Sequence, residues 1–257
     1  MIPLYFAEIP VIFSCNLNCN WCCLLSPYMK KVPPLTLDEV AATCSGWSQK
    51  LQLQEARIIG GEPLLHPDII EILDIFGQYW KPPTQIMILT NGLLLQRMPD
   101  AFFERLEKWN VVLRITIQHS AFRTQIVNSC RRLKEGSFHF WDHDKSGSWR
   151  KLYQLEEGTP KLFQSDSQKA YAACSFKRIC RAIINNELYQ CTILAYMRKC
   201  YDYGIVNDDR LLIHKPATLE MSVDELQQWL DADFSDMCCV CPETCYPIDI
   251  NEKEFAV

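Results

Sequence analysis

Apolar residues along the first part of the chain follow two alternating patterns. Continuous apolar runs that end at polar or glycine turns are typical of buried strands, and apolar residues three or four apart are typical of covering helices. The runs predict strands at residues 9–14, 56–60, 85–90, 111–120 and 137–141, with a weaker sixth strand at 151–155. The helical spacing predicts helices at residues 36–50, 69–79, 99–109 and 122–134.

Two of the predicted helices carry a recognisable start signal. Thr36 is followed three residues later by Glu39, and Ser222 by Glu225. This spacing forms a capping box, in which each side chain bonds the backbone of the other residue. We therefore expect helices to begin after Thr36 and after Ser222, the second one running to about Asp231.

Strands that alternate with helices form right-handed βαβ units and a parallel sheet. We predict an α/β fold, a partial (β/α)6 TIM-like barrel whose polar strand ends face one mouth. After Glu156 the chain becomes rich in cysteine, with a β-hairpin expected at 183–191 around Asn185-Asn186 and then the last helix. The predicted boundary separates a barrel at 1–156 from a small domain at 157–257.

The composition narrows the classes of partner. The chain has 257 residues, of which 48% are hydrophobic, enough to bury a substantial core. Its net charge of −5 argues against nucleic acid, because such partners select a basic surface. No apolar run approaches the roughly 20 residues of a membrane span, and the N-terminus lacks the features of a signal peptide. We expect a cytoplasmic protein with no membrane partner.

Fourteen cysteines are many for a cytoplasmic chain, in which disulfides are rare. Most of them form two groups, one near the N-terminus and one in the last third of the chain, which favours metal ligands. Cys44, Cys130 and Cys200 lie outside these groups, and we expect them to be ordinary core or surface thiols.

The first group has the spacing C-x3-C-x2-C at Cys15, Cys19 and Cys22, directly after the first predicted strand. Asparagines between the cysteines make the loop polar, which argues against buried structural thiols. Three thiolates can bind three corners of an iron-sulfur cube and leave the fourth iron open for chemistry. A zinc knuckle is the alternative. Cys23 is expected to point elsewhere and to be structural.

Polar turns follow the next two predicted strands. Gly60 and Gly61 would let a ligand approach the backbone closely, and the carboxylate of Glu62 could bind an amino group. Thr90 and Asn91 end the third predicted strand in the same way. Each turn alone is weak support for a site, since glycine turns after strands are common. Both gain weight because they should face the same mouth as the cysteine loop.

Taken in order, these motifs resemble the radical S-adenosylmethionine (radical SAM) enzymes. The resemblance rests on the three cysteines, on Trp21 just before the third, on the Gly-Gly-Glu-Pro turn at residues 60–63 and on the Thr-Asn-Gly turn at residues 90–92. It covers about residues 9–155, and the combination is highly specific.

The resemblance implies that Cys15, Cys19 and Cys22 hold a [4Fe-4S] cluster whose fourth iron binds S-adenosylmethionine (SAM). Residues 60–62 would hold the SAM amino group, and the backbone around Trp21 would contact the adenine. A reductant such as flavodoxin or ferredoxin would start the cleavage of SAM to a 5′-deoxyadenosyl radical, which then abstracts a hydrogen atom from the substrate.

On the fourth predicted strand, Gln118 and Ser120 stand where such enzymes often contact the ribose or carboxylate of SAM. The family's glycine-rich adenine pattern on the fifth strand is not recognisable. Trp141, Asp142 and His143 occupy that region, and we expect them to contact substrate. Phe138 and Phe140 are expected in the core.

The C-terminal cysteines resemble a twitch domain, a truncated SPASM-like domain in which a hairpin and a helix surround one auxiliary [4Fe-4S] cluster. The resemblance suggests Cys180, Cys191, Cys238 and Cys241 as its ligands. Cys174 is a rival for the first position, and Cys239 and Cys245 are further spares. Ten residues lie between the first pair, Cys180 and Cys191, which is unlike a zinc ribbon.

An auxiliary cluster could accept an electron, which suggests oxidation of an alcohol. Short enzymes of this architecture oxidise aminocyclitols or sugars, so a carbohydrate-like or aminocyclitol-like small molecule is the expected substrate. The predicted barrel begins almost at Met1, which leaves no room for the N-terminal recognition domain of many peptide maturases. Peptide modification, epimerisation with a spare cysteine such as Cys23 or Cys239, and a non-enzymatic zinc-binding or iron-sulfur protein are the alternatives.

Overall fold

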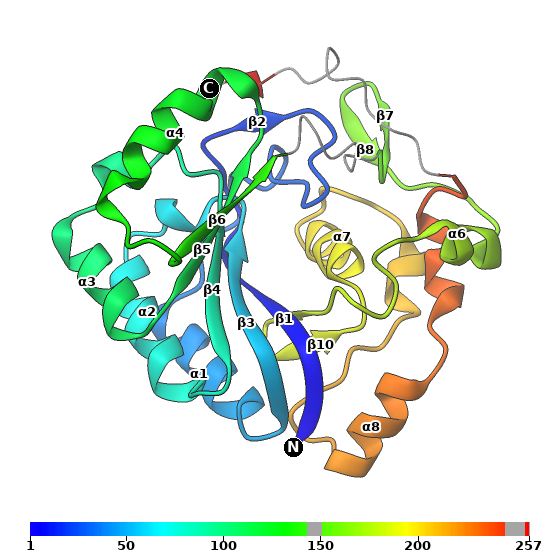
Figure 1. The fold of residues 1–257 in the computed structure, drawn as a ribbon. Coiled ribbons are helices and arrows are strands. Elements are labelled where there is room, and N and C mark those ends of the chain that lie inside the picture. The colour runs from blue at the N-terminus through cyan, green and yellow to red at the C-terminus, as the bar shows by residue number, and fades with distance from the viewer. Residues whose placement is uncertain (143–150, 245–254, 257) are drawn as a thin grey trace.

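The centre of the molecule is a seven-stranded sheet, seen in a computed structural model that describes residues 1–142, 151–244 and 255–256 (Figure 1). The strand order is β10-β9-β1-β3-β4-β5-β6, and only β10 runs antiparallel to its neighbour. The strands are β1 (Ile2–Ile12), β3 (Leu51–Gly60), β4 (Gln85–Thr90), β5 (Val112–Ile117), β6 (Phe138–Asp142), β9 (Ala182–Ile184) and β10 (Glu187–Tyr189).

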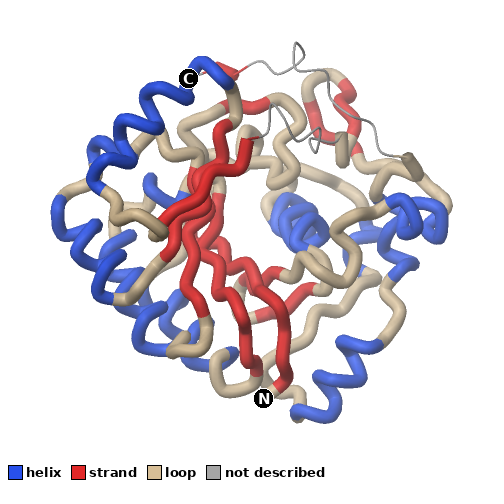
Figure 2. Tube along the Cα trace, viewed as in Figure 1, coloured by secondary structure: helices blue, strands red, loops and turns tan. Residues whose placement is uncertain are grey.

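Helices cover both faces of this sheet. The helices between consecutive strands lie together on its outer side, whereas α7 lies on the opposite side (Figures 1 and 2). The outer helices are α1 (Leu37–Trp47), α2 (Ile69–Tyr79), α3 (Asp100–Lys108) and α4 (Arg123–Ser129), and the C-terminal ones are α6 (Ser167–Ala173), α7 (Thr192–Asp202) and α8 (Val223–Asp231). The predicted α/β class, with a mostly parallel and partial TIM-like sheet, is confirmed.

Short elements complete the fold. Both predicted capping boxes are present, at Thr36 with Glu39 and at Ser222 with Glu225. No helix in the described residues is long and apolar enough to cross a membrane. The remaining elements are β2 (Asn18–Cys19), β7 (Gln154–Glu156), β8 (Thr159–Lys161), β11 (Phe255–Ala256) and the 3-10 turns Pro63–Leu65, Leu95–Arg97, Ser120–Phe122, Cys130–Arg132, Asp209–Leu212 and Ser235–Val240.

The first halves of β1 and β3 were not predicted. β1 begins at Ile2 and β3 at Leu51, earlier than the apolar runs suggest. In these halves buried and exposed residues alternate, as in the pair Leu4 and Tyr5, because one strand face meets solvent there. A continuous apolar run marks only the half that is covered on both faces.

The expected sixth strand at 151–155 is wrong. Strand β7 pairs antiparallel with β8 in a separate two-stranded sheet, and all three of its residues are exposed. It therefore has no apolar face to bury against the barrel.

The predicted hairpin at 183–191 is confirmed, with Asn185 and Asn186 at φ 53° and 62°. However, it extends the main sheet, because β9 lies beside β1 with Ala182 opposite Glu8. The boundary near residue 157 stays a prediction.

Candidate active site

A pocket of about 230 Å³ opens at the carboxyl ends of the parallel strands. The thiol loop that follows β1 forms one wall, and the turns after β3 and β4 form the next. The sequence motifs that were expected to share one mouth therefore do meet. The residues that these motifs contribute to the wall are Cys15, Cys19, Cys22, Gly60, Gly61, Thr90 and Asn91.

Cys19 is buried, and Cys15 and Cys22 are half-buried, in a setting that suits cluster ligands. Burial raises the pKa of Cys15 to about 12, and it also raises the pKa of Cys19 and of Cys22. The neighbouring thiols add to this effect at Cys19, since their negative charges would repel each other. A bound metal reverses that balance by supplying positive charge. The loop therefore holds three thiols where their ionisation is unfavourable, and a positively charged cluster would make it favourable.

Amide groups already point at two of these sulfurs. Leu17 donates its backbone N–H to the Cys15 sulfur at 3.4 Å, and Asn91 places Nδ2 at 3.8 Å from the same atom. Backbone N–H groups of the segment after Cys22 likewise lower the pKa of its thiol against the effect of burial. Hydrogen bonds to sulfur are one of the ways in which proteins tune iron-sulfur clusters.

Among residues 1–142, 151–244 and 255–256, no three His, Cys, Asp or Glu side chains form a ready site for a single metal ion. A [4Fe-4S] cube makes a different demand, because each thiolate binds its own iron atom and the sulfurs need not converge on one point. The shared pocket, the burial and the N–H donors fit a cluster of this kind.

Gly60, the last residue of β3, and Gly61 are required for a reason other than ligand approach. A Cβ on Gly60 would lie 2.3 Å from the Ile12 oxygen, and one on Gly61 would lie 2.2 Å from the Ser14 oxygen. Gly61 N–H donates to Ile12 O at 2.9 Å, and Glu62 N–H donates to Ser14 O at 3.0 Å. The missing side chains therefore let the start of the cysteine loop lie directly against the end of β3.

Glu62 is buried, and it does not line the pocket. Its carboxylate accepts hydrogen bonds from Thr90 Oγ1 at 2.7 Å, Asn91 N at 2.8 Å and Leu64 N at 3.0 Å. Burial raises the pKa of this carboxyl to about 7. The side chain thus ties the turn after β3 to the turn after β4. Contact between Glu62 itself and an amino group stays a prediction.

Asn91 continues this chain of contacts to the thiol loop. Its Nδ2 donates to Asn16 Oδ1 at 2.7 Å, and its Oδ1 accepts from Leu93 N at 3.0 Å. Three turns far apart in the sequence are therefore linked through side-chain hydrogen bonds around the pocket.

Trp21 lies outside the pocket wall. Its ring centroid is 5.4 Å from that of Tyr153, and Lys151 Nζ lies 4.8 Å from the ring. Its φ of 60° is in the left-handed region that favours glycine. Gln118 lines the pocket, whereas Ser120 is exposed and does not.

Of the expected substrate residues, Trp141 does not line the pocket. Trp141 is 41% exposed and lies against Arg114, whose guanidinium carbon is 4.4 Å from the ring centroid. Phe140 is 38% exposed, so its expected place in the core is wrong, whereas Phe138 packs against the core. Asp142 ends β6, but its side chain, like the whole of His143 and Cys245, is outside the described residues.

Sequence reasoning missed several residues on the pocket wall. Cys23 lines the pocket, so its expected place elsewhere is wrong, and Thr192 lines it too. Cys180, expected at the auxiliary cluster, also lines this first pocket. Glu8 is also there, and it did carry a signal, because it is a charged residue within an apolar strand. Cys44, Cys130 and Cys200 are buried, as expected for core thiols.

A second, smaller pocket of about 40 Å³ lies among the C-terminal cysteines. Cys174, Cys191 and Cys241 line it. Burial, and then the nearby Cys191 and Cys174, raise the pKa of Cys238 to about 12, so this fourth thiol is close by. Phe176 and Ile193 line both pockets, which are therefore separated by a common wall.

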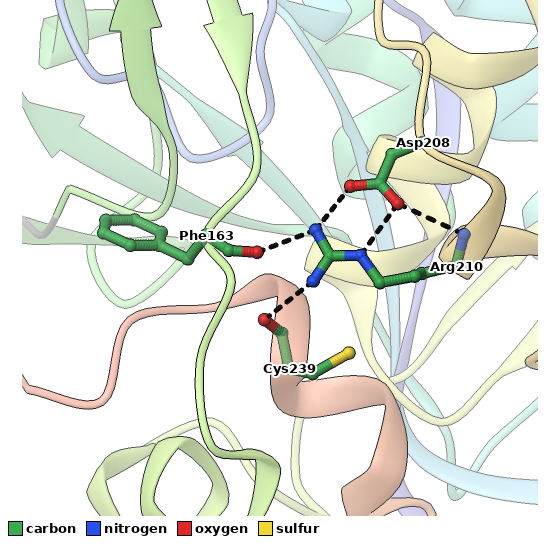
Figure 3. A network of polar contacts seen from close by, with 4 residues as sticks. All are labelled: Phe163, Asp208, Arg210 and Cys239. Carbon is green, nitrogen blue, oxygen red and sulfur yellow. Dashed lines mark hydrogen bonds and ion pairs between the residues drawn. The ribbon is translucent and has the colours of Figure 1, made fainter.

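Arg210 anchors the segment that carries the last cysteines (Figure 3). Its guanidinium donates to Phe163 O at 2.8 Å and to Cys239 O at 3.3 Å. Asp208 binds the same guanidinium at 2.9 and 2.5 Å, and these bonds lower the pKa of the Asp208 carboxyl. A single ion pair thus links three separate stretches of the C-terminal region.

Similarity to solved structures is weak in sequence. The crystal structure of BtrN in complex with AdoMet and 2-DOIA is 16% identical, with a TM-score of 0.49 over 96% of this chain and 99% of that one. Streptococcus suis SuiB bound to precursor peptide SuiA is 12% identical, with a TM-score of 0.45 over 97% of this chain and 72% of that one.

Similarity to curated proteins is higher but partial. GTP 3′,8-cyclase of Microcystis aeruginosa is 29% identical over 107 residues, which is 40% of this chain and 32% of that protein. The enzyme of Streptomyces coelicolor is 32% identical over 113 residues, 43% of this chain and 33% of that protein. The chain thus matches about a third of the length of these relatives. The model of the Radical SAM superfamily matches residues 9–138, and the chain therefore belongs to this superfamily.

Proposed function

We propose that the protein oxidises an alcohol group of a small, carbohydrate-like or aminocyclitol-like molecule, with a second iron-sulfur cluster as electron acceptor. The observation that carries this proposal is the wall between the two thiol-lined pockets. Because Phe176 and Ile193 belong to both pockets, a substrate in the first would lie next to the second group of thiols. An electron that leaves the substrate would have only a short distance to travel.

Membership of the superfamily implies a [4Fe-4S] cluster and SAM, and Cys15, Cys19 and Cys22 would hold that cluster. When bound, the cofactors would supply a 5′-deoxyadenosyl radical that takes a hydrogen atom from the alcohol carbon, and an acceptor for the electron that the substrate radical releases as its hydroxyl group loses a proton. The chain's own groups hold the site in place. Glu62 and Asn91 fix the turns around it, and the apolar side chains Leu17 and Ile59 help to keep water out of the pocket.

For the auxiliary cluster we propose Cys174, Cys191, Cys238 and Cys241 as ligands. Three of them line the second pocket, and Cys238 interacts with Cys174 and Cys191. Cys191 is the N-cap of α7, and the backbone N–H groups of Leu194 and Ile193 lower the pKa of its thiol against the effect of burial. A helix N-terminus stabilises a thiolate. This choice favours Cys174 over Cys180, because Cys180 lines the first pocket.

Epimerisation is the second candidate function. Cys23 and Cys180 both line the first pocket, where a thiol could return a hydrogen atom to a substrate radical. The proposed oxidation needs no such thiol. The two reactions differ in their products, since oxidation yields a carbonyl compound and epimerisation yields an isomer of the substrate.

Anaerobic reconstitution tests the proposal. We expect about eight iron atoms per chain and release of 5′-deoxyadenosine from SAM under dithionite. The double variant Cys191→Ala/Cys241→Ala should retain about four iron atoms and still cleave SAM, whereas Cys130→Ala, a buried thiol elsewhere, should retain about eight.

Zinc in place of iron, or intact SAM after reduction, would overturn the enzyme proposal. Full iron content in the double variant would overturn the auxiliary ligand set. Uptake of solvent deuterium by a substrate without any carbonyl product would favour epimerisation.

A further inference from the structure

We propose that Glu8, at the deep end of the first pocket, binds a protonated amine of the substrate, so that the enzyme selects a cationic amino alcohol. This inference rests on the proposed function, because it takes the pocket as the place where a small-molecule alcohol binds. It assigns a role to a largely buried carboxylate that neither the cofactor motifs nor the second group of thiols uses.

Glu8 is the one charged side chain among the described residues that line the pocket. The other lining residues are cysteines, hydroxyl and amide residues, glycines and apolar residues, and neither lysine nor arginine is among them. A phosphate or a carboxylate would therefore find no positively charged side chain on the pocket wall, because Arg57 and Arg114, which act on Glu8, do not line it. An ammonium group would meet an opposite charge in a site of low dielectric, where such attraction is strong.

The strand register puts Glu8 deeper than the other strand residues on the wall. Glu8 stands in one row across the sheet with Arg57 on β3, Met87 on β4 and Val112 on β5, each of which is paired with the next. The lining residues on those strands, such as Gly60, all come later toward the carboxyl ends. At about 3.3 Å per residue, Glu8 lies roughly 10 Å below the row of Gly60. It is thus remote from the turns that the family uses for SAM.

The neighbouring arginine leaves the Glu8 carboxylate available. Arg57 Nη1 is 3.8 Å from Glu8 Oε1, which is longer than a hydrogen bond. The same guanidinium donates from Nε to Glu55 Oε2 at 2.7 Å and lies 3.4 Å from the Phe6 ring centroid. Arg57 is therefore held mainly by Glu55, while 12% of the Glu8 side chain remains exposed.

Two further polar atoms on the pocket wall could form hydrogen bonds with a ligand. Gln118 Oε1 and Thr192 Oγ1 are buried and have no hydrogen-bond partner of normal geometry in the described part of the chain. Burial raises the pKa of the Glu8 carboxyl, and the hydroxyl of Thr192, a residue only 2% exposed, is near enough to oppose that shift. Buried polar groups are rarely left unpaired in native proteins.

These groups share one chemical preference. The Glu8 carboxylate and the Gln118 oxygen can only accept hydrogen bonds, unless the carboxyl is protonated, and a hydroxyl such as that of Thr192 can accept as well. An ammonium group brings three donors, and the hydroxyl groups of a sugar or cyclitol bring one each. A cationic amino alcohol can therefore pair with all three of these acceptors. A neutral polyol can donate hydrogen bonds to them but offers no positive charge to Glu8, and an acid would be repelled by the Glu8 carboxylate.

The test measures binding of three matched sugars by calorimetry to the reconstituted protein with SAM, without reductant. The sugars are glucosamine, glucose and glucuronate, at a slightly acidic pH where the amine is protonated. We expect glucosamine to bind about tenfold more tightly than glucose, and glucuronate to bind most weakly. Equal affinities, a preference for glucuronate, or no binding of glucosamine at millimolar concentration would overturn the proposal.

Variants assign the preference to Glu8. Glu8→Gln should lose the tenfold preference, and Glu8→Asp, which keeps the charge, should retain part of it. Glu71→Gln removes the same charge from an exposed position on α2 and should retain all of it. If Glu8→Gln keeps the preference, or if it weakens SAM binding instead, Glu8 does not bind the amine and the proposal fails. Release of 5′-deoxyadenosine by the wild-type protein under dithionite separately reports the proposed function.

Discussion

At the scale of single residues, the turns around the first pocket are held together by the carboxylate of Glu62, which is only 1% exposed. Glu62 accepts three hydrogen bonds, yet burial still raises the pKa of its carboxyl to about 7. Desolvation of the charged form therefore outweighs the donors that favour it. The turn that the family associates with SAM is, in this chain, also a titrating structural link.

The stability of the protein should fall as the pH rises through this pKa. The folded state binds the Glu62 proton more tightly than the unfolded state, whose pKa is 4.5, so this contribution is complete below about pH 4.5 and is lost above about pH 7. The shift corresponds to a loss on the order of 3 kcal/mol. Unfolding midpoints measured between about pH 5 and pH 8 should show this slope in the wild type and lack it in Glu62→Gln. Glu71→Gln, on the surface, should keep the slope, and a wild type with no slope would contradict the assignment.

Some individual residues could not be placed from the sequence. The spacing of Cys15, Cys19 and Cys22 was sufficient, because a short loop brings its own residues together. Whether Cys174 or Cys180 reaches the second pocket depends on how residues 174–191 turn between α6 and α7, and sequence spacing does not specify that path. Likewise, a side chain at a strand end, such as Trp141, can face either side.

At the scale of elements, the junction between β1 and β3 determines where the thiol loop begins. The backbone of the loop lies against Gly60 and Gly61 so closely that no side chain fits between them. Backbone hydrogen bonds from Gly61 to Ile12 and from Glu62 to Ser14 fix the register. The parallel pair of strands therefore positions the first cysteine only one residue beyond its last contact.

Gly61→Ala should displace the thiol loop. The new Cβ would lie 2.2 Å from the Ser14 oxygen, so the two backbones must separate. We expect a loss of several kcal/mol in stability and of most of the iron bound at the first site. Gly136→Ala is the matched control, because its Cβ meets nothing within 4 Å. Its φ of 83° costs about 1 kcal/mol of strain, and iron content should be unchanged. Full iron binding in Gly61→Ala would disprove this role.

Elements with a local signal were predictable, and elements defined by their neighbours were not. The capping boxes that open α1 and α8 follow from four residues each, and the Asn185-Asn186 turn follows from two that tolerate positive φ. The exposed hairpin of β7 and β8 does not differ in sequence from a short barrel strand. Strand β7 pairs with β8 and not with the main sheet, and its residues are exposed because no neighbouring surface buries them.

At the scale of the whole molecule, the C-terminal third completes the sheet that the N-terminal part begins. Strand β9 pairs with β1, and Glu8 N donates to Arg181 O at 2.8 Å. The ring of Tyr196 on α7 lies 5.8 Å from that of Phe13. Strand β1 is therefore an inner strand of the sheet, although only β3 borders it within residues 1–156.

A fragment of residues 1–156 should consequently aggregate. Removal of β9 leaves the β1 edge unpaired, and removal of α7 uncovers Phe13 and its apolar neighbours. Long exposed apolar edge strands pair with other chains. Size-exclusion chromatography of the fragment should show oligomers or insoluble material, whereas the full chain elutes as a defined species. A soluble monomeric fragment that binds iron would contradict this expectation.

The overall arrangement was predictable from the alternation of strands and helices, but the contact between the two regions was not. A three-residue strand such as β9 carries too little sequence to reveal its partner, and its pairing with β1 spans more than 170 residues of chain. The shared wall of Phe176 and Ile193 was equally unpredictable, since it depends on α7 packing on the inner side of the sheet, opposite the outer helices (Figure 1).

The place of β1 between β3 and β9 also limits how such enzymes can be recombined. A chimera that joins this N-terminal region to the C-terminal region of a relative at residue 157 would combine a β1 edge and a β9 edge that have not been matched. Glu8 would then face a foreign residue in place of Ala182, on the strand that also contributes to the pocket. Exchange of the C-terminal region should succeed only if β1 is exchanged with it. The segment that must be exchanged as a whole therefore includes residues on both sides of position 157.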